Sequence, residues 1–269
     1  MGTTQNGRWS SLRIACLQPS TTLIFEALGR LEDVCAYTKY CVEAIPSLAG
    51  GPVMHDSWQA SDEELDALNA DLIVASVPYR MEPLTKILKR GIPVLALSPR
   101  TLADVVADVR LLASVVHADP APVLDGFEGA FAEVRARVAD LEKPLVYCEE
   151  WGKPLIISQG WVAEIVVAAG GRFLGEPGKV TSAEEVSAAQ PDVMIFAWCG
   201  ARDRVPLAKV VAGRGWHDLK AVRERRVFCV DDNLLNTPAP TLVGGLRAVA
   251  GCLHPKVFPA SNRVTQLEA

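Results

Sequence analysis

The sequence predicts an α/β fold: two Rossmann-like lobes with mostly parallel sheets, joined by one long helix. Three observations predict it. Strand and helix patterns alternate before residue 122, they alternate again after residue 142, and one continuous helix pattern separates the two series. Strands that alternate with helices are typical of parallel sheets with helices on both faces. At 269 residues the chain is long enough for two domains of ordinary size.

The helix pattern over 122–142 divides the chain. Its apolar residues recur three or four positions apart, which places them on one face of an α-helix. They are Leu124, Phe127, Phe131, Val134, Val138 and Leu141. Pro144 ends the helix, because proline cannot continue one. We therefore expect an N-terminal lobe over 12–118, a connecting helix segment over 119–143 and a C-terminal lobe over 144–258.

In the first lobe, short apolar runs alternate with amphipathic segments. Strands are predicted at 12–17, 34–37, 71–75 and 93–97, and helices at 21–29, from 61 onward, at 82–90 and at 101–117. Ser20 or Thr21 is expected to cap the first helix, which ends at Gly29. Residues 41–60 show no clear period and are predicted to form a long loop with a little strand.

The second lobe repeats this alternation. Strands are predicted at 145–148, 192–197 and 227–230, and helices at 162–169, 182–189, 205–212 and 242–253. In open parallel sheets, ligands bind beyond the carboxyl ends of the strands. In this chain those ends lead into the predicted loops 18–22, 38–41, 76–80, 148–161 and 231–241.

Composition excludes several classes of function. A net charge of −5 argues against a nucleic-acid binder and against binding to an anionic membrane surface. No run of eighteen apolar residues predicts a membrane span. The opening residues lack the apolar core of a signal peptide, so we expect a cytoplasmic protein, or a periplasmic one whose signal has been removed. The seven cysteines form no CxxC pair and lie in apolar contexts, which indicates buried free thiols.

Two groups of residues are candidates for metal chemistry. His55, in the loop VMHDSW, is the histidine placed beside an expected cleft, where it can ligate a metal or cofactor. A second group could bind a soft metal, although its spacing matches no zinc module: Cys35, Cys41 and Cys148 with Glu149 and Glu150. Buried thiols and hydrogen-bonded carboxylates are the alternative interpretation. Glycine-rich phosphate loops, HExxH and GxSxG are all absent.

Large aromatic residues in the predicted loops carry more information. They are Tyr40, Trp58, Tyr79, Trp151 and Trp161. Because exposed aromatics are unfavourable, these side chains either pack beneath their loops or form walls around a flat, bulky ligand.

Four segments in a fixed order resemble a known family. They read RIACLQPSTTLIFEALGRLEDVCAYTKYC, ELDALNADLIVAS, EEWGKPLIISQGWVAEIVVAAGG and VDDNLLNTPAPTLVGGL. Over residues 12–253 the chain is similar to the class III periplasmic substrate-binding proteins of the cobalamin- and iron-siderophore-binding type. The resemblance implies two α/β lobes on one long helix, no covalent cofactor, and the permease of an ABC transporter as partner. One departure is Trp198-Cys199-Gly200, which replaces a plainer strand end.

The resemblance also implies roles for individual residues. Tyr40 and Trp58 match aromatic positions against the corrin ring of cobalamin-binding members. Segments that close the other side of the ligand are matched by Trp151, Trp161, Asp232 and Asn233. Glu63 and Glu184 match acidic residues that dock onto permease arginines. Acids at helix starts are equally explained by the helix dipole.

Three functions follow as hypotheses. The leading one is a monomeric, non-enzymatic protein that binds cobalamin, another corrinoid or a related flat metal chelate in the cleft between its lobes. The second is a cytoplasmic metal-binding enzyme or cofactor-assembly factor that uses Cys41, Cys148, Glu149 and His55. The third is a ferric-siderophore- or haem-binding component of an ABC transporter.

Overall fold

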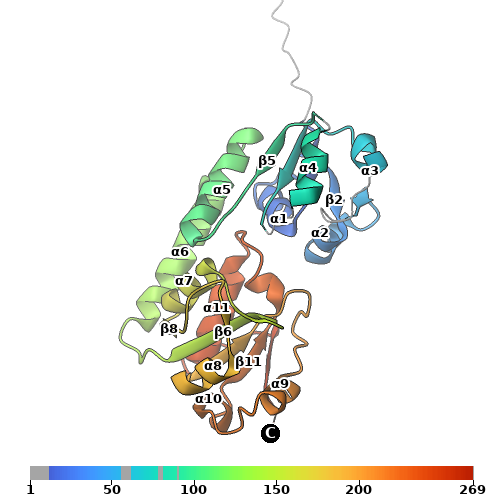
Figure 1. Ribbon diagram of the computed structural model, residues 1–269. Helices are drawn as coiled ribbons and strands as arrows, with labels where there is room; N and C mark the ends of the chain where they lie inside the picture. Colours follow the sequence, from blue (N-terminus) through green and yellow to red (C-terminus); the bar gives the residue numbers. More distant parts are fainter. Residues whose placement is uncertain (1–11, 56–61, 78–80, 90, 269) are drawn as a thin grey trace, which may run out of the picture. The chain divides into compact units, whose positions relative to one another are not determined.

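A computed structural model describes residues 12–55, 62–77, 81–89 and 91–268, and it shows the predicted α/β fold (Figure 1). The chain divides into two compact units. Unit 1 takes in 1–99 and 107–121, and unit 2 takes in 100–106 and 122–269. Among these described residues, each unit contains one sheet.

Unit 1 is built on a parallel five-stranded sheet of order β3-β2-β1-β4-β5. Its strands are β1 (Ile14–Cys16), β2 (Val34–Thr38), β3 (Val53–Met54), β4 (Leu72–Ala75) and β5 (Val94–Ala96). Its helical segments are α1 (Pro19–Ala27), η1 (Leu31–Asp33), α2 (Lys39–Ala44), η2 (Pro46–Leu48), α3 (Asp62–Ala67) and α4 (Met81–Lys89).

The strand order places the helices of unit 1 on both faces of the sheet. The chain moves outward from β1 to β3 and then returns past β1 to β4 and β5. Parallel crossovers are right-handed, so α1 and α2 cover one face and α3 and α4 the other. The reversal between β1 and β4 is a topological switch point, the place where such sheets bind ligands.

Two local predictions for unit 1 are wrong. Helix α1 is capped by Gln18 rather than by Ser20 or Thr21, because Pro19 occupies its first turn and fixes the backbone there. Thr21 instead lies inside the helix, and its hydroxyl donates to the Gln18 carbonyl over 2.9 Å. The predicted loop at 38–41 begins α2, whose six residues are too few to show a helical period in the sequence.

Unit 2 contains a mixed seven-stranded sheet of order β12-β11-β10-β6-β7-β9, with β8 also paired to β6. Its strands are β6 (Leu145–Gly152), β7 (Leu155–Ile157), β8 (Arg172–Phe173), β9 (Val180–Thr181), β10 (Val193–Phe196), β11 (Val227–Val230) and β12 (Val264–Gln266). Its helical segments are α6 (Ala121–Val138), α7 (Gly160–Ala168), α8 (Ala183–Ala189), α9 (Leu207–Gly213), α10 (Lys220–Arg223), η3 (Asp232–Leu234) and α11 (Leu242–Leu253). Helix α5 (Leu102–Val115) contributes residues to both units.

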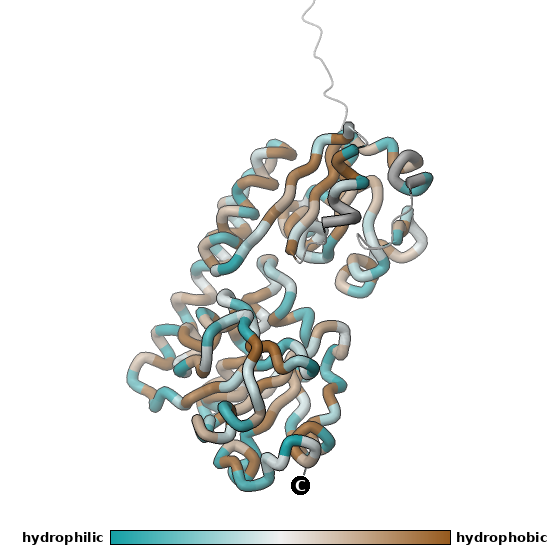
Figure 2. The backbone as a smooth tube through the Cα atoms, viewed as in Figure 1, coloured by the Kyte–Doolittle hydropathy of each residue, from teal (hydrophilic) through white to brown (hydrophobic). Residues whose placement is uncertain are grey.

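The central strands of unit 2 supply two hydrophobic cores by simple alternation. Along β6, Val146 and Cys148 face one core, and Tyr147, between them, faces the other. Ile195 and Phe196 of β10 divide in the same way. Figure 2 shows hydrophobic residues in the central strands. Helices α6, α7 and α11 cover the first core and α9 covers the second.

Helix α6 confirms the amphipathic pattern over 122–142, although it ends at Val138. Leu124, Phe127, Phe131, Val134 and Val138 are all buried. The last four of these residues belong to the first core of unit 2. Leu141 lies beyond the helix and packs against that core while partly exposed.

The predicted loop over 148–161 is wrong. Strand β6 continues to Gly152, turns at Lys153-Pro154 and returns as the antiparallel strand β7. Helix α7 then starts at Gly160. Polar residues and turn signals in EEWGKP indicate a loop in the sequence, but the two glutamates lie on a strand, where each accepts a hydrogen bond from another side chain.

Candidate functional site

In unit 1, the predicted ligand contacts lie on short elements. Tyr40 is in the first turn of α2 with its side chain 40% exposed, and the Lys39 ammonium lies 4.9 Å from the centre of its ring. His55 follows β3 and is exposed. Its Nδ1 lies 2.8 Å from Glu64 Oε1. Glu63, in α3, is exposed as docking would require. Trp58, like Tyr79, lies outside the described residues.

The switch point of unit 1 is held by one side chain. Gln18, directly after β1, accepts a hydrogen bond at Oε1 from the Ser76 backbone N–H over 2.7 Å. Ser76 directly follows β4. This bond joins the two loops that leave β1 and β4 at their carboxyl ends, which are two of the loops expected to meet ligand.

In unit 2, a buried carboxylate organises the carboxyl ends of β6 and β10. Glu149 is fully buried and accepts hydrogen bonds from Tyr147 Oη at 2.5 Å and from Trp198 Nε1 at 2.8 Å. Arg214 donates to both of its oxygens, at 2.7 and 2.9 Å. The guanidinium also lies 4.8 Å from the centre of the Trp216 ring. Burial and the adjacent Glu149 charge raise the pKa of Tyr147 well above its usual value.

This network fixes an indole at the surface of unit 2. Trp198 directly follows β10, and its ring lies against the backbone of Gly152. A Cβ at position 152 would approach the ring to 2.5 Å, so glycine is required for this packing. Trp151 provides a second indole, 45% exposed, whose Nε1 donates to the Lys153 carbonyl over 2.9 Å.

The two indoles line a pocket of about 730 Å³ that lies wholly within unit 2. Its walls come from the β6–β7 turn, the residues after β10, and α9 with its flanks. They are Trp151, Gly152, Lys153, Leu155, Trp198, Cys199, Gly200, Ala201, Pro206, Lys209, Val210, Gly213 and Arg214. This size, with aromatic walls and few polar groups, suits a small-molecule site.

A cluster of polar groups lies at the same end of the sheet. The Gln159 amide donates to the Glu150 carboxylate, and burial raises the pKa of Glu150 to about 7. Cys199 is exposed, its backbone N–H donates to the Glu150 carbonyl over 3.1 Å, and its sulfur accepts from Asn236 Nδ2 over 3.3 Å. Glu149 and Glu150 therefore have separate partners and do not act as a carboxylate pair.

The structure corrects the expected roles of two residues in unit 2. Trp161 lies in α7 rather than in a loop and is only 4% exposed. Its Nε1 donates to the Leu235 carbonyl over 2.7 Å, so its indole forms part of the core. The Asp232 carboxylate is buried and accepts from the backbone N–H groups of Gly200 and Arg202, at 2.7 and 2.9 Å. It holds the turn after β10 in place, and both of its oxygens are thereby engaged.

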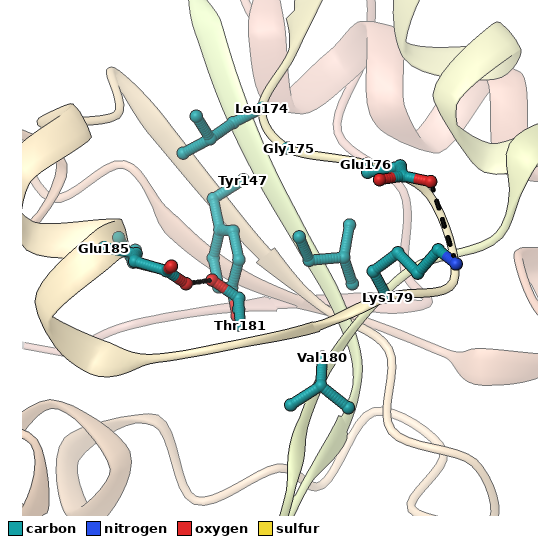
Figure 3. A pocket seen from close by; sticks show the side chains of 10 residues that line it. Tyr147, Leu174, Gly175, Glu176, Lys179, Val180, Thr181 and Glu185 are labelled. Atoms are coloured by element: carbon teal, nitrogen blue, oxygen red, sulfur yellow. Dashed lines mark hydrogen bonds and ion pairs between the residues drawn. The ribbon is translucent and has the colours of Figure 1, made fainter.

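A smaller hollow of about 290 Å³ lies beside α8 (Figure 3). Tyr147 and Val180 line it, and Glu185 accepts a hydrogen bond from Thr181 over 2.7 Å.

Glu184, the predicted docking residue, is exposed in the first turn of α8. Asn233 lies in η3 and is half-buried.

The described residues do not assemble the predicted metal cluster. Among them, no group of three or more His, Cys, Asp or Glu side chains could hold a metal ion. Cys41 and Cys148 are fully buried, and burial raises the pKa of Cys148 far above its usual value. Glu149 is likewise fully buried and accepts from four donor groups, whereas His55, the fourth residue of this hypothesis, is exposed.

No motif in the sequence singles out the residues that complete the pocket. Lys209 lies in α9, a helix without a recognisable motif, and Arg214 directly follows it, so their proximity to Trp151 depends on how α9 packs. Trp198 offered a signal, since an indole directly after a buried strand is placed where parallel sheets bind ligands.

Within the described ranges, no helix is both long enough and apolar enough to cross a membrane.

Comparisons with known proteins agree with this architecture. A model of the periplasmic binding protein family matches residues 14–234. An uncharacterized ABC transporter substrate-binding lipoprotein of Bacillus subtilis, YvrC, is 22% identical, and the match spans 91% of this chain and 81% of the relative.

Solved structures share the fold. A periplasmic heme-binding protein from Pseudomonas aeruginosa has a TM-score of 0.83 at 19% identity, covering 96% of this chain and 98% of that one. The periplasmic vitamin B12-binding protein BtuF of Vibrio cholerae has a TM-score of 0.70 at 22% identity, covering 90% and 96%. The family match leads to one conclusion, with which the shared fold agrees: this chain belongs to the periplasmic binding protein family.

Proposed function

We propose that this protein binds a flat metal chelate, in the first instance a cobalamin-like corrinoid, and delivers it to the permease of an ABC importer without catalysing a reaction. The observation that carries the proposal is the pocket of about 730 Å³ that Trp151 and Trp198 line in unit 2. Indole faces stack on flat conjugated rings, and the rest of the lining is mainly apolar.

Several residues support the proposal as further ligand contacts. Tyr40 is exposed on α2 and Asn233 is half-buried in η3, so both side chains are accessible to a ligand. Trp58 is proposed to lie against the corrin ring, as the family resemblance implies. We do not propose Trp161 and Asp232 as direct contacts. The Trp161 indole donates to the Leu235 carbonyl, and the Asp232 carboxylate accepts from the Gly200 backbone N–H.

Haem is the second candidate ligand. It is favoured by the Pseudomonas aeruginosa protein, whose name describes heme binding and whose fold matches with a TM-score of 0.83. His55 is exposed and is the proposed axial ligand of its iron. Replacing His55 with alanine leaves the haem spectrum unchanged if stacking alone holds the ring, and shifts it if His55 is an axial ligand.

The permease is proposed to dock on the exposed carboxylates of Glu63 and Glu184. Each lies in the first turn of a helix, one in each unit. Relatives named periplasmic or lipoprotein favour the periplasmic alternative over a cytoplasmic protein. We propose that the protein binds its ligand and docks on the permease as a monomer.

The test is an absorbance titration of the purified protein with cyanocobalamin, dicyanocobinamide, haem and a ferric siderophore. We expect saturable binding of a corrinoid or haem with a dissociation constant of micromolar order, about −8 kcal/mol. The proposal fails if none of the four binds more tightly than about 1 mM.

A further inference from the structure

The walls of the pocket in unit 2 carry positive charge in an acidic protein. The chain has a net charge of −5, yet none of the thirteen described residues that line this pocket is Asp or Glu. Lys153, Lys209 and Arg214 all line it. The charged residues of the lining are therefore all positive, whereas the net charge of the whole chain is negative.

The three cations are not equivalent. Arg214 is neutralised by Glu149, to which it donates two hydrogen bonds. Lys153 and Lys209 are exposed, and within the described parts of the chain neither ammonium has an acidic partner. Two unpaired ammonium groups thus border a pocket whose walls are two indoles.

The indoles are held in position before any ligand arrives. Trp198 is fixed by Glu149 on one side and by the backbone of Gly152 on the other. The Nε1 of Trp151 is bonded to the Lys153 carbonyl in the same turn that presents the Lys153 side chain. A preorganised aromatic wall loses little entropy when a ring stacks on it.

From this combination we infer that the pocket takes a flat ring that carries a phosphate or carboxylate, the ring stacking on the indoles and the anion lying between Lys153 and Lys209. The inference rests on the proposed function, because it names the part of the chelate that unit 2 recognises. Two sources supply this chemistry: the benzimidazole nucleotide with its phosphate in cobalamin, or the ring edge with its propionates in haem.

The first experiment measures the pocket's charge preference by calorimetry with 2-naphthoate and its neutral isostere 2-naphthamide. We expect the naphthoate to bind about 3- to 10-fold more tightly, since two exposed ion pairs each add little. The preference disappears in the double variant Lys153→Gln/Lys209→Gln and persists in Lys256→Gln, an exposed lysine outside the pocket. Equal affinity of the wild type for both probes, or no binding of either, overturns the inference.

The second experiment identifies the source of the anion. If the phosphate of cobalamin enters the pocket, the double lysine variant weakens cyanocobalamin but not dicyanocobinamide. If a propionate enters, it weakens haem but not haem dimethyl ester. Tight binding of a chelate that is indifferent to both lysines contradicts the inference and leaves the proposed function standing. A naphthoate preference without binding of any chelate contradicts the proposed function and leaves the inference about the pocket standing.

Discussion

At the scale of single residues, Glu149 is a fully buried carboxylate of unit 2. A carboxylate with no exposed surface is stable as an ion only when it is paired and hydrogen-bonded, and Glu149 receives donors from three side chains. The sequence flagged Glu149 as a candidate acid or metal ligand. It could not show that Arg214, which directly follows α9 and lies more than sixty residues later, is its counter-ion.

Removing that counter-ion tests the importance of the pair. Arg214→Met leaves the Glu149 charge buried and is expected to lower the free energy of unfolding by about 3–5 kcal/mol. Urea unfolding followed by circular dichroism measures the change. In the double variant Glu149→Gln/Arg214→Met much of the loss is recovered, because no buried charge remains. A loss below about 1 kcal/mol in the single variant contradicts this account.

Gly152 offers a steric test of the aromatic wall. The methyl group of Gly152→Ala meets the Trp198 ring at 2.5 Å, so the indole must move. We expect chelate binding to weaken by about tenfold, since the displaced indole loses a stacking contact worth roughly 1–3 kcal/mol. Gly213→Ala is the matched control in the same pocket, because its methyl group meets nothing within 4 Å. Equal affinities of the two variants would show that the position of Trp198 is irrelevant.

Glu150 predicts a dependence of stability on pH. Its pKa in the folded protein, about 7, lies above the value of about 4.5 expected in the unfolded chain. The folded state therefore binds more protons between these values, and the contribution of Glu150 to stability falls as pH rises from about 4.5 to 7. Urea unfolding at pH 5 and pH 8 checks this for the wild type and Glu150→Gln. The glutamine variant should gain stability relative to the wild type at pH 8, and a gain at pH 5 alone would refute the assignment.

At the scale of elements, long periodic segments were predictable and the β6–β7 hairpin was not. Helix α11 begins and ends where its apolar period predicts, and so does strand β11. The sequence does not predict the hairpin because β6 carries two glutamates beyond Cys148, and the burial of Glu149 depends on Arg214, a partner distant in sequence. Turn signals beside Trp161 likewise predict a loop there, although α7 buries this residue.

Helix α8 shows that local signals are reliable where they are complete. Ser182 accepts from the Glu185 backbone N–H over 3.1 Å, and the Glu185 carboxylate accepts from the Ser182 N–H over 3.0 Å, as a capping box requires. Ser182→Ala is expected to lower the free energy of unfolding by about 1 kcal/mol. Thermal unfolding measures it, with Ser187→Ala in the same helix as the control. A smaller effect at Ser182 than at Ser187 would contradict the assigned cap.

At the scale of the whole molecule, the sequence predicted the fold class and the family, while the identity of the ligand follows from neither. Relatives of the same fold are named for heme and for vitamin B12, so the fold is compatible with several chelates. Under the proposed function, selectivity lies in side chains such as Trp151, Trp198 and the lysines at their edge, which come together only when the β6–β7 turn packs beside α9.

The proposed function requires the exposed indole of Trp151 in unit 2 to hold a flat metal chelate. Calorimetric titration of the wild type and of Trp151→Ala with the tightest-binding chelate tests it most directly. Stacking on an aromatic side chain contributes roughly 1–3 kcal/mol, so we predict affinity to fall by about tenfold or more in Trp151→Ala with no loss of thermal stability. Equal dissociation constants for the two proteins would contradict the claim.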